Sequence, residues 1–313
     1  MEYFFTARRR SAGRYTDEIG PIRYLEVPED APAMVQEHEV SNSATWFNRV
    51  QHAAKAGNAS EGTVLFYVHG FNTEQHEMRT RHKKIVAGLK AQGFDGVVVS
   101  YDWPSDGELL SYASDRADAR AAANGLLGKG LYEFVRRQTV DCQINVHVLA
   151  HSMGCFVLRE AFDYADDNHE AAQTSWSVSQ IALVAADISS KSMLAGSPKS
   201  SSLLRHAARV TNYYNPYDGV LSISGVKRVG LARRLGRVGL PDPRSVKTVN
   251  LNCGPYFDDH RDDFDHGLRA THTWYFDSPR FFEDLAHTLA GALDRDVIPR
   301  RERGPEGGLV LRP

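Results

Sequence analysis

Residues 144–154 read INVHVLAHSMG, and this stretch decides the fold class that we predict. Its first part, Ile144–Leu149, is a compact apolar run of the kind found in strands buried on both faces of a parallel sheet. The following AHSMG places small residues two positions before and two positions after Ser152. Small neighbours allow a strand and a helix to meet closely at a sharp turn. We therefore expect Ser152 on a strained strand-to-helix turn, with a helix over 153–166.

The same alternation of elements extends along the chain in both directions. Compact apolar runs that predict further strands are Val64–Val68, Val97–Tyr101, Ile181–Val184, Val210–Tyr214 and Val246–Leu251. Segments with helical spacing lie between them or after them, at Thr73–Gln92, at Ala113–Arg137 and beyond the cap-like pair Ser278-Pro279. Strand and helix in regular alternation predict a doubly wound α/β domain with a mostly parallel sheet and helices on both faces.

The ends of the chain have a different pattern. We expect Tyr3–Thr6 and Ile22–Val27 to be antiparallel edge strands and Ala44–Ala54 to be a helix. The single domain is predicted to span 1–298, with its core at about 60–290. The tail from 299 to 313 lacks a core-forming pattern, and we predict that it is disordered.

Two internal segments are candidates for a lid. Residues 222–244 are rich in glycine and arginine and are expected to leave the sheet. The sequence does not decide whether this segment or 105–130 forms a lid over the region around Ser152.

Composition excludes several classes of protein. A net charge of −2 argues against a nucleic-acid partner, and the local clusters Arg8–Arg10 and Arg228, Arg233, Arg234 and Arg237 are interpreted as solvated faces. Cys142, Cys155 and Cys253 have neither disulfide-framework nor zinc-site spacing. No apolar run reaches the roughly 18 residues of a membrane helix, and MEYFFTARRR is no signal peptide. We predict a cytoplasmic protein without stable membrane insertion and without a cofactor; the oligomeric state stays open.

A serine nucleophile needs a general base, and the base needs a carboxylate that fixes its tautomer. On this type of sheet the acid and then the histidine follow the serine along the chain. Asp218 is the preferred acid because it follows the strand at 210–214 in a turn-rich loop, Asn215–Gly219. Asp187, at the end of the preceding strand, is the alternative acid.

His272 is the preferred base because it lies just before the terminal helix, where a loop can hold its ring over the sheet. His260 and His266 are weaker candidates, and His287 falls within that helix. The run DDHRDDFDH at 258–266 contains possible ligands for a divalent cation, but its spacing defines no coordination geometry. We interpret it as a solvated acidic loop and predict no metal.

Two backbone N–H groups are expected to stabilise the oxyanion. One belongs to Met153, at the start of the helix after the serine. The other belongs to Phe71, in the segment His69-Gly70-Phe71-Asn72 after the strand at 64–68. We expect His69 to serve in packing and hydrogen bonding.

Taken together, HGFN, YDWPS, AHSMG, VAADIS and the late HTWYF resemble a bacterial branch of the α/β-hydrolase superfamily, known mainly as a domain of unknown function. The resemblance covers roughly residues 60–290. It implies an α/β-hydrolase sheet, a triad of Ser152, Asp218 and His272, and a site wall shaped by Trp103 and Pro104. Ala150 departs mildly from the commoner first glycine. We place Asn72, Trp103 and His151 at the substrate pocket.

The predicted function is an esterase-like serine hydrolase that acts on a small-molecule acyl substrate through an acyl-enzyme. A thioesterase or an acyltransferase with the same triad is the alternative. A catalytically silent binding protein on this fold is the alternative from another class. The sequence does not define the acyl chain or the leaving group.

Overall fold

A computed structural model describes residues 1–55, 61–105, 112–137, 143–226, 233–291, 297–305 and 308–313. Within these residues the strands form one sheet in the order β2-β1-β4-β3-β5-β6-β7-β8-β10-β9. Every neighbouring pair is parallel except β1 with β2 and β9 with β10. The predicted α/β-hydrolase sheet, mostly parallel and wound on both faces, is confirmed.

The strands cover the predicted apolar runs, and most extend beyond them, except at Val246–Leu251, where β8 begins only at Thr248 and Val246 is exposed. Their bounds are β1 Glu2–Ser11, β2 Arg14–Val27, β3 Glu61–Val68, β4 Val97–Asp102, β5 Gln143–His151, β6 Val178–Val184, β7 Ala207–Tyr214, β8 Thr248–Asn252, β9 Arg301–Arg303 and β10 Leu309–Leu311.

The helices follow the strands in the expected order. The α-helices are α1 Ser43–Ala54, α2 Gln75–Ala91, α3 Tyr112–Leu126, α4 Tyr132–Val135, α5 Gly154–Asp167, α6 His169–Gln173, α7 Ser201–Arg205, α8 Gly219–Val226, α9 Leu235–Val238, α10 Gly254–Asp259, α11 Ala270–Thr273 and α12 Pro279–Ala290. A π-helical turn, η2 (Leu127–Leu131), joins α3 to α4, and short 3-10 turns lie at η1 Gln36–His38, η3 Ser190–Met193, η4 Arg261–Asp263 and η5 Trp274–Asp277. Ser278 caps α12 as expected, because its side chain accepts a hydrogen bond from the Phe281 N–H.

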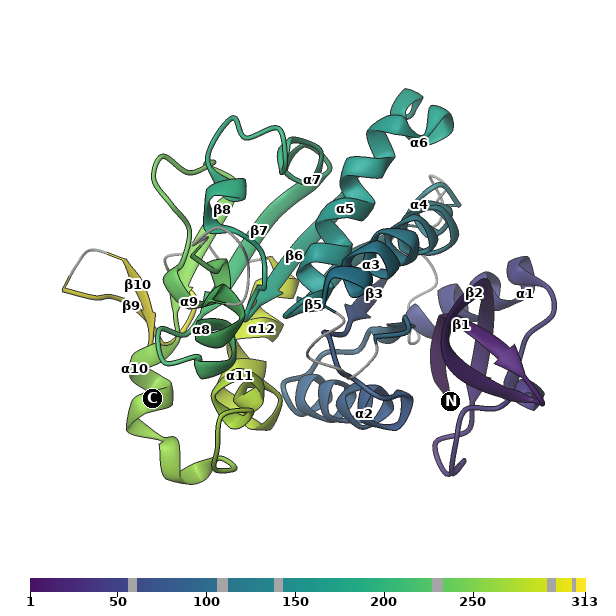
Figure 1. Ribbon diagram of the computed structural model, residues 1–313, viewed down its shortest axis with the longest axis horizontal. Coiled ribbons are helices and arrows are strands. Elements are labelled where there is room, and N and C mark those ends of the chain that lie inside the picture. Colours follow the sequence, from purple (N-terminus) through teal and green to yellow (C-terminus); the bar gives the residue numbers. More distant parts are fainter. Residues whose placement is uncertain (56–60, 106–111, 138–142, 227–232, 292–296, 306–307) are drawn as a thin grey trace.

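Two hydrophobic cores lie on opposite faces of the sheet, and Figure 1 shows α3 and α5 on one side and α2, α11 and α12 on the other. The central strand β3 supplies both cores in alternation. Val64, Phe66 and Val68 belong to the core beside α1, α3 and α5, whereas Leu65 and Tyr67 belong to the core beside α2 and α12. A strand covered on both faces therefore reads as a continuous apolar run.

The segment from 299 onward differs from our prediction of a disordered tail. Its described residues form the hairpin of β9 and β10, and β10 pairs in parallel with β8. Leu311 is fully buried, and the Arg301 guanidinium donates to both carboxylate oxygens of Asp284 in α12. Two short strands gain their stability from this docking, which a local sequence pattern does not reveal.

Two segments named as possible lids are only partly described, because 106–111 and 227–232 lie outside the described residues. The described parts of 222–244 include the end of α8 and all of α9. None of the described helices is long and apolar enough to cross a bilayer.

Several buried histidines have pKa values below the ordinary value, mainly because burial penalises the charged ring. Burial lowers the pKa of His69 and of His147 to about 4 and that of His82 to about 3. The unfolded chain therefore binds more protons than the folded chain between about pH 6.5 and pH 4. The stability that these neutral rings provide is complete above about pH 6.5 and is lost as the pH falls toward 4.

We expect the free energy of unfolding to fall by about 1.4 kcal/mol per pH unit for each such histidine in this window. His147→Leu should reduce that slope by the contribution of one proton, about 1.4 kcal/mol per pH unit, when urea unfolding is measured between pH 7 and pH 4.5. The same titration of His52→Gln, at an exposed position, should keep the wild-type slope. An unaltered slope in His147→Leu would show that His147 titrates normally in the folded protein.

Candidate active site

Ser152 lies at the junction of β5 and α5 with a left-handed backbone, φ 55°. Its N–H donates to Val184 O at 3.0 Å, and its own carbonyl accepts from the N–H of Asp187 at 3.0 Å. Non-glycine residues adopt such a conformation only where the surroundings enforce it. Here Val184, at the end of β6, binds the N–H of the serine, and Asp187, three residues later, binds its carbonyl.

Two glycines make the turn possible by removing side chains at close contacts. A Cβ at Gly154 would lie 2.4 Å from the carbonyl oxygen of Val68 and 2.5 Å from that of His69. A Cβ at Gly70 would lie 2.8 Å from the Cβ of Ser152. The AHSMG turn is therefore packed directly against the HGFN segment.

The structure brings Asp218 and His272 together. The Nδ1 of His272 lies 2.6 Å from Oδ2 of Asp218, and both side chains are buried. A carboxylate can only accept, so Nδ1 carries the proton and Nε2 is left as the acceptor in the neutral ring. The second carboxylate oxygen, Oδ1, accepts from the N–H of Leu221 at 2.9 Å.

Further hydrogen bonds join the loop that carries Asp218 to the segment that carries His272. The Asn215 side chain donates from Nδ2 to the carbonyl of Thr271 at 3.2 Å, and the N–H of Gly219 donates to Oγ1 of Thr271 at 2.9 Å. The acid and the histidine are thus held by their backbones as well as by their direct contact. A base that is fixed in this way loses little freedom when it acts.

His151, placed at the substrate pocket by the sequence, is almost completely buried beside His272. Its Nε2 lies 3.0 Å from His272 O, and the two ring centroids are 4.7 Å apart. Burial, with a further contribution from His272, holds the pKa of His151 well below its ordinary value. His151 therefore supports the backbone of His272 as a neutral ring.

Asp187, the alternative acid, has a different partner. Its Oδ1 lies 3.1 Å from Nε of Arg234, which is buried, and its N–H binds the Ser152 carbonyl. The interpretation of Arg234 as part of a solvated face is therefore wrong. The Asp187–Arg234 pair supports the turn of the serine, because the N–H of Asp187 binds the Ser152 carbonyl.

The two expected oxyanion donors lie at the same end of the sheet. Met153 immediately precedes α5, in a region where helix N–H groups have no intrahelical acceptor. Phe71 follows Gly70, whose backbone packs against Ser152. The Nδ1 of His69 lies 2.8 Å from Gly70 O, and its Nε2 accepts a hydrogen bond from the N–H of Trp103 at 3.1 Å. These contacts agree with the packing and hydrogen-bonding role that we expected for His69.

The other two pocket residues lie in different environments. Trp103 is fully buried, stacks on His69 and donates from Nε1 to His69 O at 2.9 Å. It supports the HGFN segment from within and does not form an open wall. Asn72 is exposed and has a φ of 49°.

The weaker candidates for the base lie elsewhere. The ring of His260 stacks on Tyr256, and Nδ1 lies 2.9 Å from that residue's carbonyl oxygen. His266 is exposed, and it lines a cavity of about 590 Å³ whose walls also include Thr273 and Phe276. Ser152, Asp218 and His272 are not part of its lining. Over the described ranges, no three His, Cys, Asp or Glu side chains are grouped so that they could hold a metal.

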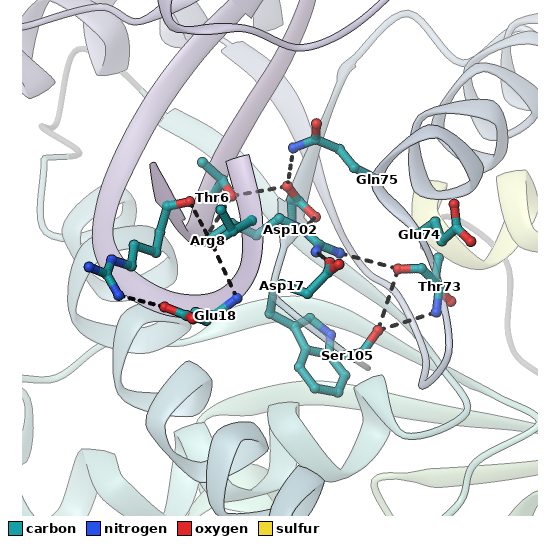
Figure 2. A network of polar contacts seen from close by, with 12 residues as sticks. Thr6, Arg8, Asp17, Glu18, Thr73, Glu74, Gln75, Asp102 and Ser105 are labelled. Atoms are coloured by element: carbon teal, nitrogen blue, oxygen red, sulfur yellow. Dashed lines mark hydrogen bonds and ion pairs between the residues drawn. The ribbon is translucent and has the colours of Figure 1, made fainter. Parts of the chain in front are cut away.

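Sequence reasoning missed a polar network beside the HGFN segment, which Figure 2 shows. Arg8 is buried and contacts Asp102 and Thr73, so its assignment to a solvated face is wrong. Asp102 could have been found, because it follows an apolar strand as Asp187 does. Nothing in the run ARRR distinguishes Arg8 from Arg9 and Arg10.

Comparison with known proteins identifies the family of this chain. A family described as an α/β hydrolase of unknown function, DUF900, matches residues 43–286. The chain belongs to that family. Ser152, Asp218 and His272 lie within the matched residues, whereas Arg8 lies outside them.

Two similar proteins give no activity for this α/β hydrolase. An uncharacterized protein from Nostoc sp., alr1448, is 25% identical over 62% of this chain and 59% of its own length. The phospholipase PlaB from Legionella pneumophila, solved with thio-NAD, matches 50% of this chain and 38% of its own, at 12% identity and a TM-score of 0.29. This chain thus spans less than two thirds of either protein, and the structural likeness is too low to support an argument.

We expect Gly154→Ala to lower the free energy of unfolding by about 1–3 kcal/mol, because its Cβ meets backbone atoms that cannot move aside cheaply. Gly128→Ala is the matched control, since a Cβ there meets nothing within 4 Å in a helical turn. That substitution should stabilise the protein by up to about 1 kcal/mol. Urea unfolding of both variants measures the difference. Equal stability of Gly154→Ala and wild type would contradict the close packing of the turn.

Proposed function

We propose that this α/β hydrolase is a serine hydrolase that cleaves a carboxylic ester. The observation that carries the proposal is the 2.6 Å contact of His272 with Asp218. It lies at the carboxyl ends of the parallel strands, where Ser152 adopts its strained turn. An acid–histidine pair and a serine on a strained turn are the groups that acyl-transfer enzymes need; here Ser152 follows β5, Asp218 follows β7, and His272 lies in α11. The substrate is a small molecule with an acyl group.

In the first step Nε2 of His272 removes the proton of the Ser152 hydroxyl while Oγ attacks the ester carbonyl carbon. The backbone N–H groups of Phe71 and Met153 stabilise the oxyanion. Collapse of this intermediate releases the alcohol, which takes the proton from His272, and leaves an acyl group on Ser152. Water, deprotonated by His272, then attacks the acyl-enzyme and releases the acid and free Ser152.

Asp218 acts on His272 in both steps through a hydrogen bond and through its charge. Its carboxylate accepts a hydrogen bond from the Nδ1–H of His272, which keeps the proton on Nδ1 and leaves Nε2 to act as the base. When His272 becomes positively charged, the adjacent carboxylate stabilises the charge. A thioesterase or an acyltransferase would use the same groups up to deacylation, and product analysis with thiol esters and alternative acceptors distinguishes them.

We expect Ser152→Ala to lower kcat for short p-nitrophenyl esters by about 10⁴-fold or more. A fluorophosphonate probe should label the wild type and leave Ser152→Ala unlabelled, because the probe reacts with an activated serine. The unfolding midpoint of the variant should stay close to that of the wild type, which serves as the control for folding. Near wild-type hydrolysis by Ser152→Ala would refute the proposal.

We expect Asp218→Asn to lower kcat by about 10⁴-fold, since an amide can stabilise the wrong tautomer of His272. Asp187→Asn is the comparison for the two candidate acids. It should retain a far larger kcat but unfold at lower urea, because it weakens the pairing of the buried Arg234. Steady-state kinetics and urea unfolding on both variants check this. The opposite order of kcat values would assign the acid role to Asp187.

A further inference from the structure

Thr73 holds the segment that carries the expected oxyanion donor Phe71. Its hydroxyl donates to the carbonyl of Phe71 at 3.3 Å. The N–H of Thr73 donates to Oγ of Ser105 at 3.2 Å, and the Ser105 hydroxyl donates to the carbonyl oxygen of Thr73 at 3.4 Å. Because Thr73 is almost fully buried and bonded at three atoms, it restrains the Phe71 carbonyl and, through the Cα of Phe71, the N–H of the same residue.

Arg8 reaches Thr73 from β1, a strand that is far away in the sequence. Its Nη2 donates to Thr73 O at 3.3 Å, and its Nε donates to Oδ1 of Asp102 at 2.8 Å (Figure 2). Its Nη1 pairs with Asp17 on the neighbouring strand β2. Only about 1% of Arg8 is exposed, so the guanidinium has little freedom to leave this position.

Asp102, which is joined to Thr73 through Arg8, binds two further residues. Its Oδ2 accepts from the Thr6 hydroxyl and from Nε2 of Gln75, each at 2.9 Å. Burial by itself would raise the pKa of Asp102, but the Arg8 guanidinium holds it below the ordinary value. The Arg8–Asp102 ion pair therefore binds the residues at both ends of the stretch from Thr73 to Gln75, where α2 begins.

We propose that Arg8 is a positioning residue for the oxyanion loop, defined here as residues 70–75. It acts through Thr73 and Asp102 to hold the Phe71 N–H where charge develops on the substrate. This inference rests on the proposed function for its catalytic consequence. It adds a residue from the N-terminal hairpin, which lies before the region matched by the family at 43–286.

A role in positioning predicts a specific kinetic signature. A donor to the oxyanion acts more strongly in the transition state than on the bound ester, so its displacement lowers kcat and leaves KM nearly unchanged. Loss of such a donor costs about 10²–10³ in rate, and a displacement costs part of that. A purely structural arginine would lower stability without changing the kcat of the folded molecules.

The test compares Arg8→Met with Arg9→Met. Arg9 is next to Arg8 on the same strand, but it is exposed and pairs with the exposed Glu18. We expect Arg8→Met to lower kcat for p-nitrophenyl esters by about 10- to 100-fold, with KM within about threefold, and to weaken phenylboronic acid inhibition in parallel. Arg9→Met should match the wild type in all three measurements.

Amide hydrogen exchange tests the positioning without any assumption about the reaction. Peptides that cover 70–75 should exchange faster in Arg8→Met than in wild type and Arg9→Met, whereas peptides from β7 should not change. Folded Arg8→Met with wild-type kcat and wild-type exchange would overturn the proposal. If Ser152→Ala kept its activity, the proposed function would fail, but the exchange result would still decide the role of Arg8.

A milder variant covers the case in which Arg8→Met does not fold. Gln75→Leu removes one hydrogen bond to Asp102 and leaves the buried ion pair intact. It should accelerate exchange in 70–75 and lower kcat in the same direction as Arg8→Met, by a smaller factor. Unchanged exchange and kcat in folded Gln75→Leu would refute the proposed link from Asp102 to the oxyanion loop.

Discussion

The close approach of backbone at the β5–α5 junction is the constraint on which the rest of the site depends. Ser152 can hold its left-handed conformation only because Gly154 lies against the carbonyls of Val68 and His69 and Gly70 lies against Ser152. The same contacts bring the HGFN segment to the serine. Since both segments follow neighbouring parallel strands, β3 and β5, the sheet itself sets the distance between them.

Buried ion pairs join outlying segments to this framework. Arg8 of the N-terminal hairpin meets Asp102, Arg234 of the segment before α9 meets Asp187, and Arg301 of the C-terminal hairpin meets Asp284. Removal of one partner from such a pair leaves an uncompensated charge in the interior, so each pair specifies one docked position for its segment. Figure 1 shows the two terminal hairpins at opposite ends of the sheet, and the family match covers neither of them.

The polar groups near Ser152 divide into two sets with different chemistry. His272 binds the carboxylate of Asp218 through Nδ1, and the proposed function uses its other nitrogen as a proton carrier. His69 and His151 are held neutral by burial and bind backbone carbonyl groups of Gly70 and His272. Three histidines close together can therefore have unequal roles, because burial and hydrogen bonding act on each ring separately.

The sequence by itself determined most strands and helices of the central sheet and their order, because these depend on local pattern. Continuous apolar runs indicated strands with two covered faces, and small residues around Ser152 indicated the turn. The pairing of His272 with Asp218, and of Asp187 with Arg234, was decided only by the tertiary structure. The same holds for the burial of Arg8 and for the docking of the C-terminal hairpin. These features depend on contacts between residues far apart in the chain, and a side chain's identity does not reveal which distant partner the folded sheet will place beside it.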